Sequence, residues 1–284
     1  MKYTMSHFKK NINGVRYLLV FATNFKRENP YIQEWLEYHL LVGIDHFYLY
    51  DQDGGEEARE LLEPYVKAGL VTRHPWIHYD GTRYDGPTRF YQINKNHLAF
   101  SHCATNYRSD AEWMMKIDVD EFLYPPTGND SLIPYLNSLD KKRIKGIKIP
   151  RYNYGDSGHM TSPGGLVTEA YRYRESDFSD HKDMANCRFL GNNKFCHSAH
   201  SWHYRLLNPG KLIEETDANG IRVNHYYTKS FEEYQNRQNV SCGRGGDKET
   251  FMARNKGCNE IEDTGMLRFS GVIRHNLQKR VEAL

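Results

Sequence analysis

Short apolar runs alternate with helix-like stretches along the first half of the chain. The run at 17–22 is continuous and has the length of a buried strand, and the runs at 46–50 and 113–117 have the same character. Further strand-like segments stand at 70–73 and 144–149, and another lies next to His225, before the helix predicted from about 230. Because strands and helices alternate, the pattern predicts an α/β fold with a mostly parallel central sheet flanked by helices.

The first predicted helix has clear signals at both ends. Asn29 offers a capping side chain, and Pro30 has the fixed φ suited to the first helical position. Apolar side chains then recur at helical spacing around Trp35 until Gly43, which favours a helix end. Further helices are predicted at 56–67, at roughly 91–107, at 131–139 and from about 230 onward.

Polar side chains follow the predicted strands at 17–22, 46–50 and 113–117 at their C-terminal ends. They are Asn24, Asp51, Asp53, Asp118 and Asp120. The first strand is expected to end just before Asn24. Because ligands of open α/β sheets bind outside the carboxyl ends of the strands, we expect these side chains around one crevice.

The acidic triplet Asp118-Val119-Asp120 is the strongest chemical signal. Two carboxylates at this spacing can face one hard divalent cation, Mn²⁺ or Mg²⁺, whose shell a nucleotide diphosphate completes. The cation would offset negative charge on a leaving diphosphate. Solvated acids in a surface loop give the same triplet, but apolar residues flank this one on both sides, so its charges need a partner or a cation. Glu121 fits either a supporting group or a salt-bridge partner.

Composition excludes some classes of function. The formal net charge is only +2, so a general nucleic-acid binder is not expected, because such proteins carry a basic domain or stripe. The basic cluster at 141–145 is interpreted as a solvated edge. Aromatic residues make up 13% of the chain, enough to supply flat platforms for a sugar or a base as well as core.

Cysteine usage and hydropathy set the expected location. The five cysteines have no Cys-x-x-Cys spacing, so neither a zinc site nor a disulfide framework is indicated, and a reducing compartment is expected. No stretch approaches the ~20 apolar residues of a membrane helix, and the N-terminus has no signal-peptide core. We therefore expect a soluble, cytoplasmic protein. A removed anchor, association with a membrane surface and the oligomeric state are left open.

Three segments carry a resemblance to a known family. They read RENPYIQEWLEYH at 27–39, GIDHFYLYD at 43–51 and IDVDEF at 117–122. In this order and spacing the chain resembles glycosyltransferase family 92 and the related family-2-like proteins. The likeness extends to Gln92, to His225-Tyr226 and to KSFEEY at 229–234, so it covers roughly residues 15–245.

The resemblance implies a GT-A fold, a nucleotide-sugar donor, a divalent cation and inversion at the anomeric carbon. It implies transfer of a hexose, with galactose as the candidate, from a uridine-diphosphate donor onto a glycan acceptor. By position, the donor-binding residues would be Asn24, Glu28, Asp51, Asp53, Gln92 and Asp118. The metal ligands would be Asp118, Asp120 and His225.

An inverting transfer needs a general base that deprotonates the acceptor hydroxyl. We favour Asp156, because its loop is flanked by glycine and follows the strand expected to end at Pro150. A turn-forming Asp that bonds its own backbone fits the sequence equally well. Glu169 is the alternative base.

Basic side chains in the second half are candidates for phosphate or acceptor contacts. They are Lys182, His200, Arg237 and Arg244. His197 and His203 stand near His200, and three such histidines also suggest zinc. Zinc is the weaker interpretation, because no acid or cysteine there completes a tetrahedral site.

Two other classes of function compete with the transferase hypothesis. A metal-dependent nucleotidyl or phosphoryl transferase would also place acids at strand ends, although the Gly-x-x-x-x-Gly-Lys-Ser/Thr loop is absent. A non-catalytic carbohydrate-binding protein on the same fold is the other. We expect one glycosyltransferase domain at 15–250, with a nucleotide-sugar half at 15–125 and an acceptor-side half at 126–250. An extension at 1–14 precedes it, and a helical tail at 251–284 follows.

Overall fold

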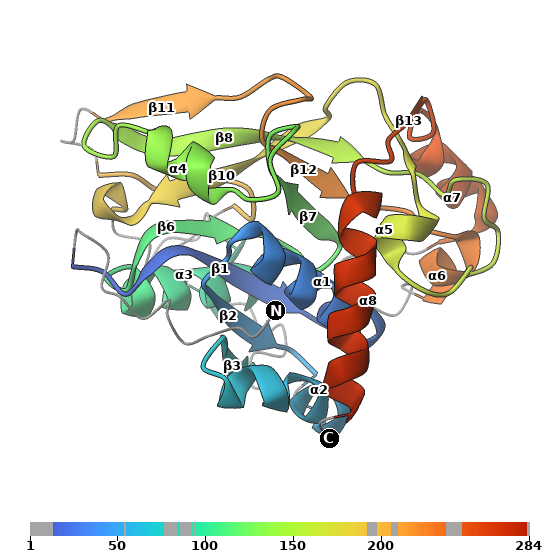
Figure 1. The fold of residues 1–284 in the computed structure, drawn as a ribbon, viewed down its shortest axis with the longest axis horizontal. Helices are drawn as coiled ribbons and strands as arrows, with labels where there is room; N and C mark the ends of the chain where they lie inside the picture. Colours follow the sequence, from blue (N-terminus) through green and yellow to red (C-terminus); the bar gives the residue numbers. More distant parts are fainter. Residues whose placement is uncertain are drawn as a thin grey trace.

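The computed structural model describes residues 14–53, 55–76, 84–85, 92–93, 95–191, 198–205, 210–236 and 246–282. Strands and helices alternate up to β6, apart from the short pair β4 and β5, and strands of the second half then complete the sheet (Figure 1). The strands are β1 (Tyr17–Phe25), β2 (His46–Asp51), β3 (Val71–Pro75), β4 (Tyr84–Asp85), β5 (Gln92–Ile93), β6 (Ala111–Lys116), β7 (Glu121–Tyr124), β8 (Ile144–Asn153), β9 (Tyr173–Arg174), β10 (Asp180–Asn186), β11 (Lys211–Glu214), β12 (Arg222–His225) and β13 (Ile261–Glu262). The helices are α1 (Asn29–Val42), α2 (Glu56–Lys67), α3 (Lys95–Tyr107), α4 (Ile133–Ser138), α5 (Val167–Ala170), the 3-10 turn η2 (Cys187–Phe189), α6 (Phe231–Asn236), α7 (Lys248–Asn255) and α8 (Leu267–Glu282).

One large mixed sheet runs through the molecule in the order β3-β2-β1-β6-β10-β8-β12-β7, and β11 pairs with β8 beside this path. The strands β3, β2, β1 and β6 are parallel. β10 is antiparallel to both of its neighbours, whereas β11 and β12 are parallel to β8, and β7 is antiparallel to β12. The predicted α/β class is confirmed, and its arrangement agrees with the GT-A type that the resemblance implies.

The central parallel strands β1, β2 and β6 are buried on both faces because helices cover each side. In β1, Leu19 and Phe21 belong to one core cluster with α1, whereas Val20 and Ala22 belong to a second cluster with α3. This alternation follows from the two-residue repeat of a strand. It explains why the sequence of β1 is a continuous apolar run rather than an alternating one.

Several predicted boundaries in the first half are wrong by a few residues. The helix predicted from about residue 91 begins at Lys95, and Gln92–Ile93 form the strand β5. β1 continues to Phe25, so Asn24 lies within the strand and not after it. The N-cap of α1 is Glu28 rather than Asn29, and its side chain makes no capping hydrogen bond. Gly43 does end α1, with φ 108° in the left-handed region, as predicted.

The strand β8 continues past Pro150 to Asn153, beyond the predicted end. Residues up to Lys148 pair with β11, and pairing with β12 begins at Arg151. Pro150 therefore falls between the two stretches, where its missing N–H removes no bond from either ladder. This continuation carries Arg151 and Asn153 to the strand ends.

The last helix, α8, packs into the main core. α8 runs beside α1 (Figure 1), and its Phe269 and Ile273 are buried in the same core cluster as the apolar side chains of α1. Glu37 of α1 is fully buried and accepts hydrogen bonds from Tyr65 (2.9 Å) and Asn276 (3.0 Å), and it pairs with Arg280. One carboxylate therefore joins α1, α2 and α8.

In the described residues, no helix is both long and apolar enough to span a bilayer. Cys103, Cys187 and Cys258 are buried free thiols. Cys196 and Cys242 lie outside the described residues.

Replacement of Arg280 with Met should lower the free energy of unfolding by about 3 kcal/mol, because it leaves the buried Glu37 carboxylate without its cation. The double variant Glu37→Gln/Arg280→Met should recover part of this loss. Lys279→Met, an exposed position on the same helix, is the control and should change little. Urea unfolding measures all three. Equal effects of Arg280→Met and Lys279→Met would show that the buried pair does not hold α8.

Candidate functional site

The strand registers place the predicted polar side chains at one edge of the sheet. Asp51 pairs with the last residue of β1, and Ala22 of β1 pairs with Lys116 of β6. Asn24 and Asp118 each follow that second pair by two residues. The C-terminal ends of β1, β2 and β6 therefore meet, as expected from the α/β pattern.

The side chains of α1 hold β7, the strand at one end of the sheet. Trp35 Nε1 donates to the Glu121 carbonyl (2.8 Å), and Tyr38 Oη donates to the Leu123 carbonyl (3.1 Å). The Leu123 N–H donates to His39 Nε2 (3.0 Å). Burial lowers the pKa of His39 to about 3, so the ring is neutral and can accept this bond. β7 is the last strand of the sheet, and these α1 side chains bond its backbone where a further strand would otherwise do so. They thereby fix the segment that follows Asp120.

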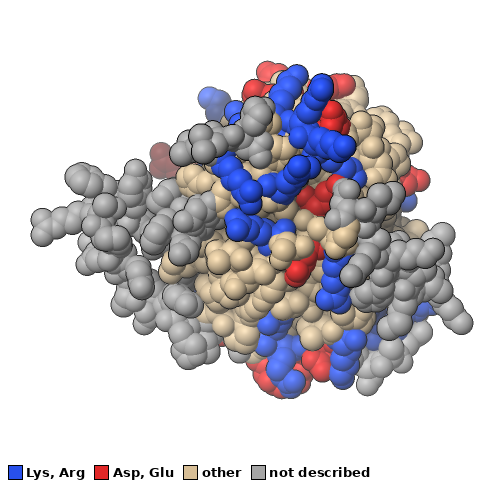
Figure 2. Space-filling view, turned by 90° about the vertical axis from the view of Figure 1, so that its left-hand side faces the viewer, with Lys and Arg blue, Asp and Glu red and all other residues tan. Residues whose placement is uncertain are grey.

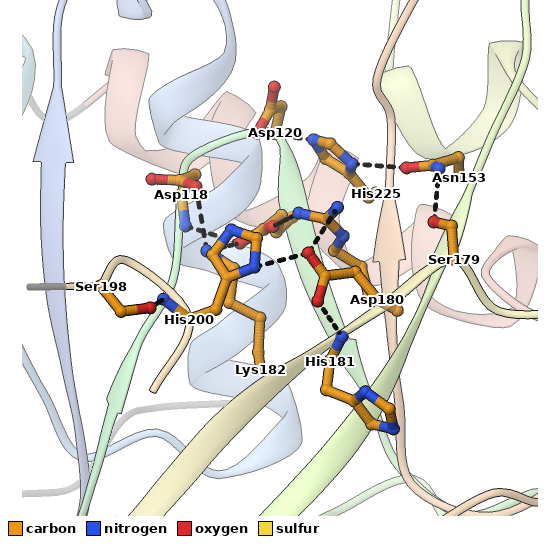
Figure 3. A network of polar contacts seen from close by, with 12 residues as sticks. Asp118, Asp120, Asn153, Ser179, Asp180, His181, Lys182, Ser198, His200 and His225 are labelled. Carbon is orange, nitrogen blue, oxygen red and sulfur yellow. Dashed lines mark hydrogen bonds and ion pairs between the residues drawn. The ribbon is translucent and has the colours of Figure 1, made fainter. Parts of the chain in front are cut away.

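The Glu121 carboxylate, which is completely buried, organises the acidic turn. It accepts a hydrogen bond from the Asp118 N–H (3.0 Å) and pairs with Lys182 Nζ (2.7 Å) and Arg151 Nη1 (3.3 Å). Lys182 is also fully buried, and its Nζ lies 3.0 Å from Asp118 Oδ2 (Figure 3). Glu121 is thus a salt-bridge partner, one of the two roles that the sequence left open.

Charge pairing in this network outweighs the cost of burial. Burial acts to raise the pKa of Glu121, but the cations Lys182 and Arg151 counter it and hold the pKa at about 2. Burial acts to lower the pKa of Lys182, but Asp118 and Glu121 outweigh it and the pKa is raised. Both groups are therefore charged at neutral pH.

His225 faces Asp120 across a short gap. Asn153 Nδ2 donates to Glu175 (3.2 Å) and Ser179 (2.7 Å), which leaves Oδ1 to accept from His225 Nδ1 (2.8 Å) (Figure 3). Burial lowers the pKa of His225 despite the opposing effect of Asp120, so the ring is neutral. The lone pair therefore resides on Nε2, which lies 3.6 Å from Asp120 Oδ1.

The pair of Asp120 and His225 fits a divalent cation. A carboxylate oxygen and a neutral imidazole nitrogen that face each other are both electron donors, and Mn²⁺ accepts both types of ligand. Asp118 is different, because Lys182 occupies its Oδ2. No group of three His, Cys, Asp or Glu side chains in the described part of the chain is arranged to hold a metal ion as it stands. The three-ligand set thus stays a prediction.

His200 lies beside the acidic turn through a separate set of contacts. Its Nδ1 is 2.6 Å from Asp180 Oδ2, which also pairs with Arg151 Nη2 at 3.4 Å (Figure 3). Buried Lys116 donates to the carbonyls of Ser198 (2.9 Å) and Ser201 (2.6 Å) and so fixes the segment that carries His200. Burial lowers the pKa of His200. His197 lies outside the described residues.

The predicted donor-binding residues occupy two adjoining loops and a strand end. Arg73 donates from Nε (2.9 Å) and Nη2 (2.7 Å) to Asp51 Oδ2, so a cation already neutralises this acid. Asp53 accepts from the Arg27 N–H (2.6 Å), which links the loop after β2 to the loop after β1. Asn24 is buried at the end of β1. The side chain of Gln92, and the whole of Arg237 and Arg244, lie outside the described residues.

The two candidate bases differ in their contacts. Asp156 is buried, and its Oδ1 accepts from the Gly158 N–H (3.1 Å) and from Asn259 Nδ2 (3.0 Å). These are the bonds of a turn-forming Asp, the other role that the sequence allowed. Both carboxylate oxygens of Glu169 bind Arg274 of α8, and this hydrogen bonding lowers the pKa of Glu169.

Backbone strain in the described residues gathers in the loops around this edge of the sheet. The non-glycine residues with positive φ are Arg27 (56°), Ser157 (50°) and Lys229 (52°). They lie in the loops after β1, β8 and β12, whose ends carry Asn24, Asn153 and His225. Non-glycine residues in the left-handed region are unfavourable and cluster at functional sites in many proteins.

Sequence reasoning missed Arg151, Asn153 and Asp180. The first two lie past Pro150, where the strand was predicted to have ended. Asp180 begins β10, whose sequence DHKDMAN has no strand-like apolar pattern. Alternation of polar and apolar residues at 151–153 was the one local signal available.

Comparison with known proteins identifies the family of this chain. The family model described as glycosyltransferase family 92 matches residues 21–243. A glycosyltransferase family 92 protein of Arabidopsis thaliana is 26% identical over 227 residues, 77% of this chain and 36% of that protein. A galactan beta-1,4-galactosyltransferase of the same plant is 38% identical over 101 residues, 34% of this chain and 19% of that protein.

Among solved structures, Staphylococcus aureus TarS 1-349 in complex with UDP covers 88% of this chain and 68% of its own, with 9% identity and a TM-score of 0.42. The chain belongs to glycosyltransferase family 92. It spans about a third of the length of the curated family members that it matches.

The role of Lys182 can be tested by pH dependence. Lys182→Met should lower the free energy of unfolding by about 3 kcal/mol near pH 7, because the buried Glu121 loses a partner. In the wild type the pKa of Glu121 is about 2, which is below the ordinary value of a glutamate. The stabilisation that the ionised carboxylate gives the folded state is therefore present at neutral pH and is lost as the pH falls toward 2.

Without Lys182 the folded-state pKa of Glu121 should rise, and protonation should then remove the unpaired charge. The deficit of the variant should therefore shrink between about pH 7 and pH 4 in urea unfolding. Lys148→Met, on the neighbouring strand β8, is the control and should show little deficit at either pH. A deficit of Lys182→Met that is the same at both pH values would contradict this role.

Proposed function

We propose that this chain transfers a hexosyl group, with galactose as the candidate, from a UDP-sugar to a hydroxyl of a glycan, with inversion and with the help of Mn²⁺ or Mg²⁺. The observation that carries this proposal is the pair of electron donors, His225 Nε2 and Asp120 Oδ1, 3.6 Å apart at the carboxyl end of the sheet. Membership of glycosyltransferase family 92 and the galactosyltransferase relatives support it.

Asp118, Asp120 and His225 would hold the cation. When bound, the cation would neutralise charge on the donor's diphosphate as the bond to the sugar breaks. Asn153 presents the Nε2 lone pair by binding Nδ1–H. A second bond of this kind commonly fixes the tautomer and direction of a metal-binding histidine.

The charged network behind the turn would keep the acids in place before the donor arrives. Lys182 and Arg151 neutralise Glu121, and Glu121 fixes the Asp118 backbone. Lys182 contacts both Glu121 and Asp118. Its ammonium group and the bound divalent cation would therefore share the Asp118 carboxylate. Preorganised charges of this type need no rearrangement during the reaction.

Asp156 is the proposed base. Its Oδ1 is engaged in the turn, but no hydrogen bond to Oδ2 occurs within the described residues. Glu169, by contrast, has both oxygens bound to Arg274, and its lowered pKa makes it a weaker base. The contacts therefore favour Asp156 over Glu169.

Cation-dependent donor binding is the first test. In the presence of Mn²⁺, one of a panel of nucleotide diphosphates, UDP by expectation, should raise the melting temperature, because the ligand binds the folded state. Asp120→Asn should abolish this shift. Asp130→Asn, an exposed acid paired with Arg268, is the matched control and should preserve it. No metal-dependent shift with any nucleotide would refute the transferase proposal.

The second test separates catalysis from binding. Asp156→Asn should keep the Mn²⁺-dependent melting shift with UDP, because an amide oxygen can still accept the two turn bonds, but it should slow sugar transfer about 100-fold or more. Release of UDP from a panel of UDP-hexoses with glycan acceptors measures the rate. Glu169→Gln is the comparison and should retain most of the activity. Normal turnover of Asp156→Asn would exclude it as the base and make Glu169 the next candidate.

A further inference from the structure

A second concave site lies at the opposite ends of the strands that carry the acidic turn. It is a surface pocket of about 720 Å³ where β1 and β6 begin, and Val15, Ala111 and Glu112 form part of its wall. The turn before β6, the end of α4 with the α4–β8 connection, the end of β10 with η2, and Arg205 form the rest. Glu112 and Asp118 are six residues apart on and after β6, so roughly 20 Å separates the pocket from the acidic turn.

Cationic side chains dominate the lining of this pocket. They are Arg108, Lys141, Lys142, Arg188 and Arg205, against the two acids Glu112 and Asp140. Figure 2 looks onto this side of the molecule and shows basic side chains gathered across its upper half. The sequence had suggested a solvated edge at 141–145, but Lys141 and Lys142 line a hollow together with three arginines from distant segments.

Most of this positive charge has no internal counter-charge. Glu112 pairs with Lys141 at 2.8 Å, and Asp140 lies 3.7 Å from Arg143, which is not part of the lining. In the described parts of the chain, no carboxylate pairs with the other four cations, Arg108, Lys142, Arg188 and Arg205. Like charges held around one hollow repel each other unless an anion enters.

Two of the guanidinium groups are held in place by neighbouring carbonyls. Arg108 Nη1 donates to the Gly191 carbonyl (3.0 Å), and Arg205 Nε donates to the Leu190 carbonyl (3.2 Å). A guanidinium has five N–H donors, so each retains others for a ligand. Fixed guanidinium groups bind phosphate oxygens in pairs and lose little entropy when they do so.

We propose that this pocket binds a phosphate group, separately from the donor site. A compact dianion suits several cations that converge from different segments better than a single carboxylate does. The phosphate could belong to a free small molecule or to a lipid headgroup, since both present the same chemistry. Because the pocket lies at the other end of β6, this inference stands apart from the proposed transferase chemistry.

The direct test is calorimetric titration with inorganic pyrophosphate in the presence of EDTA. The double variant Lys142→Gln/Arg188→Gln removes two exposed cations whose side chains make no hydrogen bond in the described residues. Its dissociation constant for pyrophosphate should rise about tenfold or more. The matched control Arg59→Gln/Lys67→Gln removes the same charge from α2, outside the pocket, and should bind like the wild type.

Further arms separate this site from the donor site and identify the source of the phosphate. Asp120→Asn should bind pyrophosphate like the wild type, so failure of the donor site leaves this result intact. Cosedimentation with phosphatidylglycerol vesicles, but not with phosphatidylcholine vesicles, and displacement by pyrophosphate would assign a lipid headgroup. Pyrophosphate binding without vesicle binding would assign a free phosphate. Equal affinity of the wild type and the pocket variant, or no binding to the wild type, would overturn the proposal.

Discussion

The buried carboxylate of Glu121 is the contact on which the site depends. It joins three parts of the chain that are far apart in sequence, the acidic turn, β8 through Arg151 and β10 through Lys182. A buried charge is costly on its own, and here two cations and a backbone N–H compensate it. The α1 side chains fix the same residue from the other side, through its carbonyl. The position of Asp118 therefore follows from a balance of charge inside the molecule and not from the loop alone.

The sequence predicts the parallel half of the fold well, because strands buried on both faces leave apolar runs that can be read directly. It also predicts that Asn24, Asp51 and Asp118 gather at one edge of the sheet, although Asn24 and Asp51 lie inside β1 and β2 and not after them. It could not predict β10, since that strand satisfies buried Lys182 and Asp183 through distant partners and so has a polar sequence. The roles of Arg151 and Asn153 depend on β8 exchanging its partner β11 for β12 near Pro150. This exchange is set by the tertiary structure and leaves no local pattern in the sequence.

The antiparallel β10 gives the two halves of the chain one continuous sheet. It pairs with β6 of the first half and with β8 of the second. Lys182, in the middle of β10, links the same two halves through charge. Asp118 and His225 therefore sit on one rigid frame, and any movement needed for substrate entry falls to the connecting loops, where the strained residues Arg27, Ser157 and Lys229 are found.

The position of α8 shows that the stretch matched by the family model is shorter than the stretch that packs into one core. The family model ends at residue 243, whereas α8 begins at Leu267 and completes the core around α1. Because α1 in turn holds β7 beside the acidic turn, the segment shared with relatives is smaller than the segment that must fold together. A fragment cut at the edge of the shared region would expose the apolar side of α1 to water, so the boundaries of a useful recombinant fragment should follow packing rather than similarity.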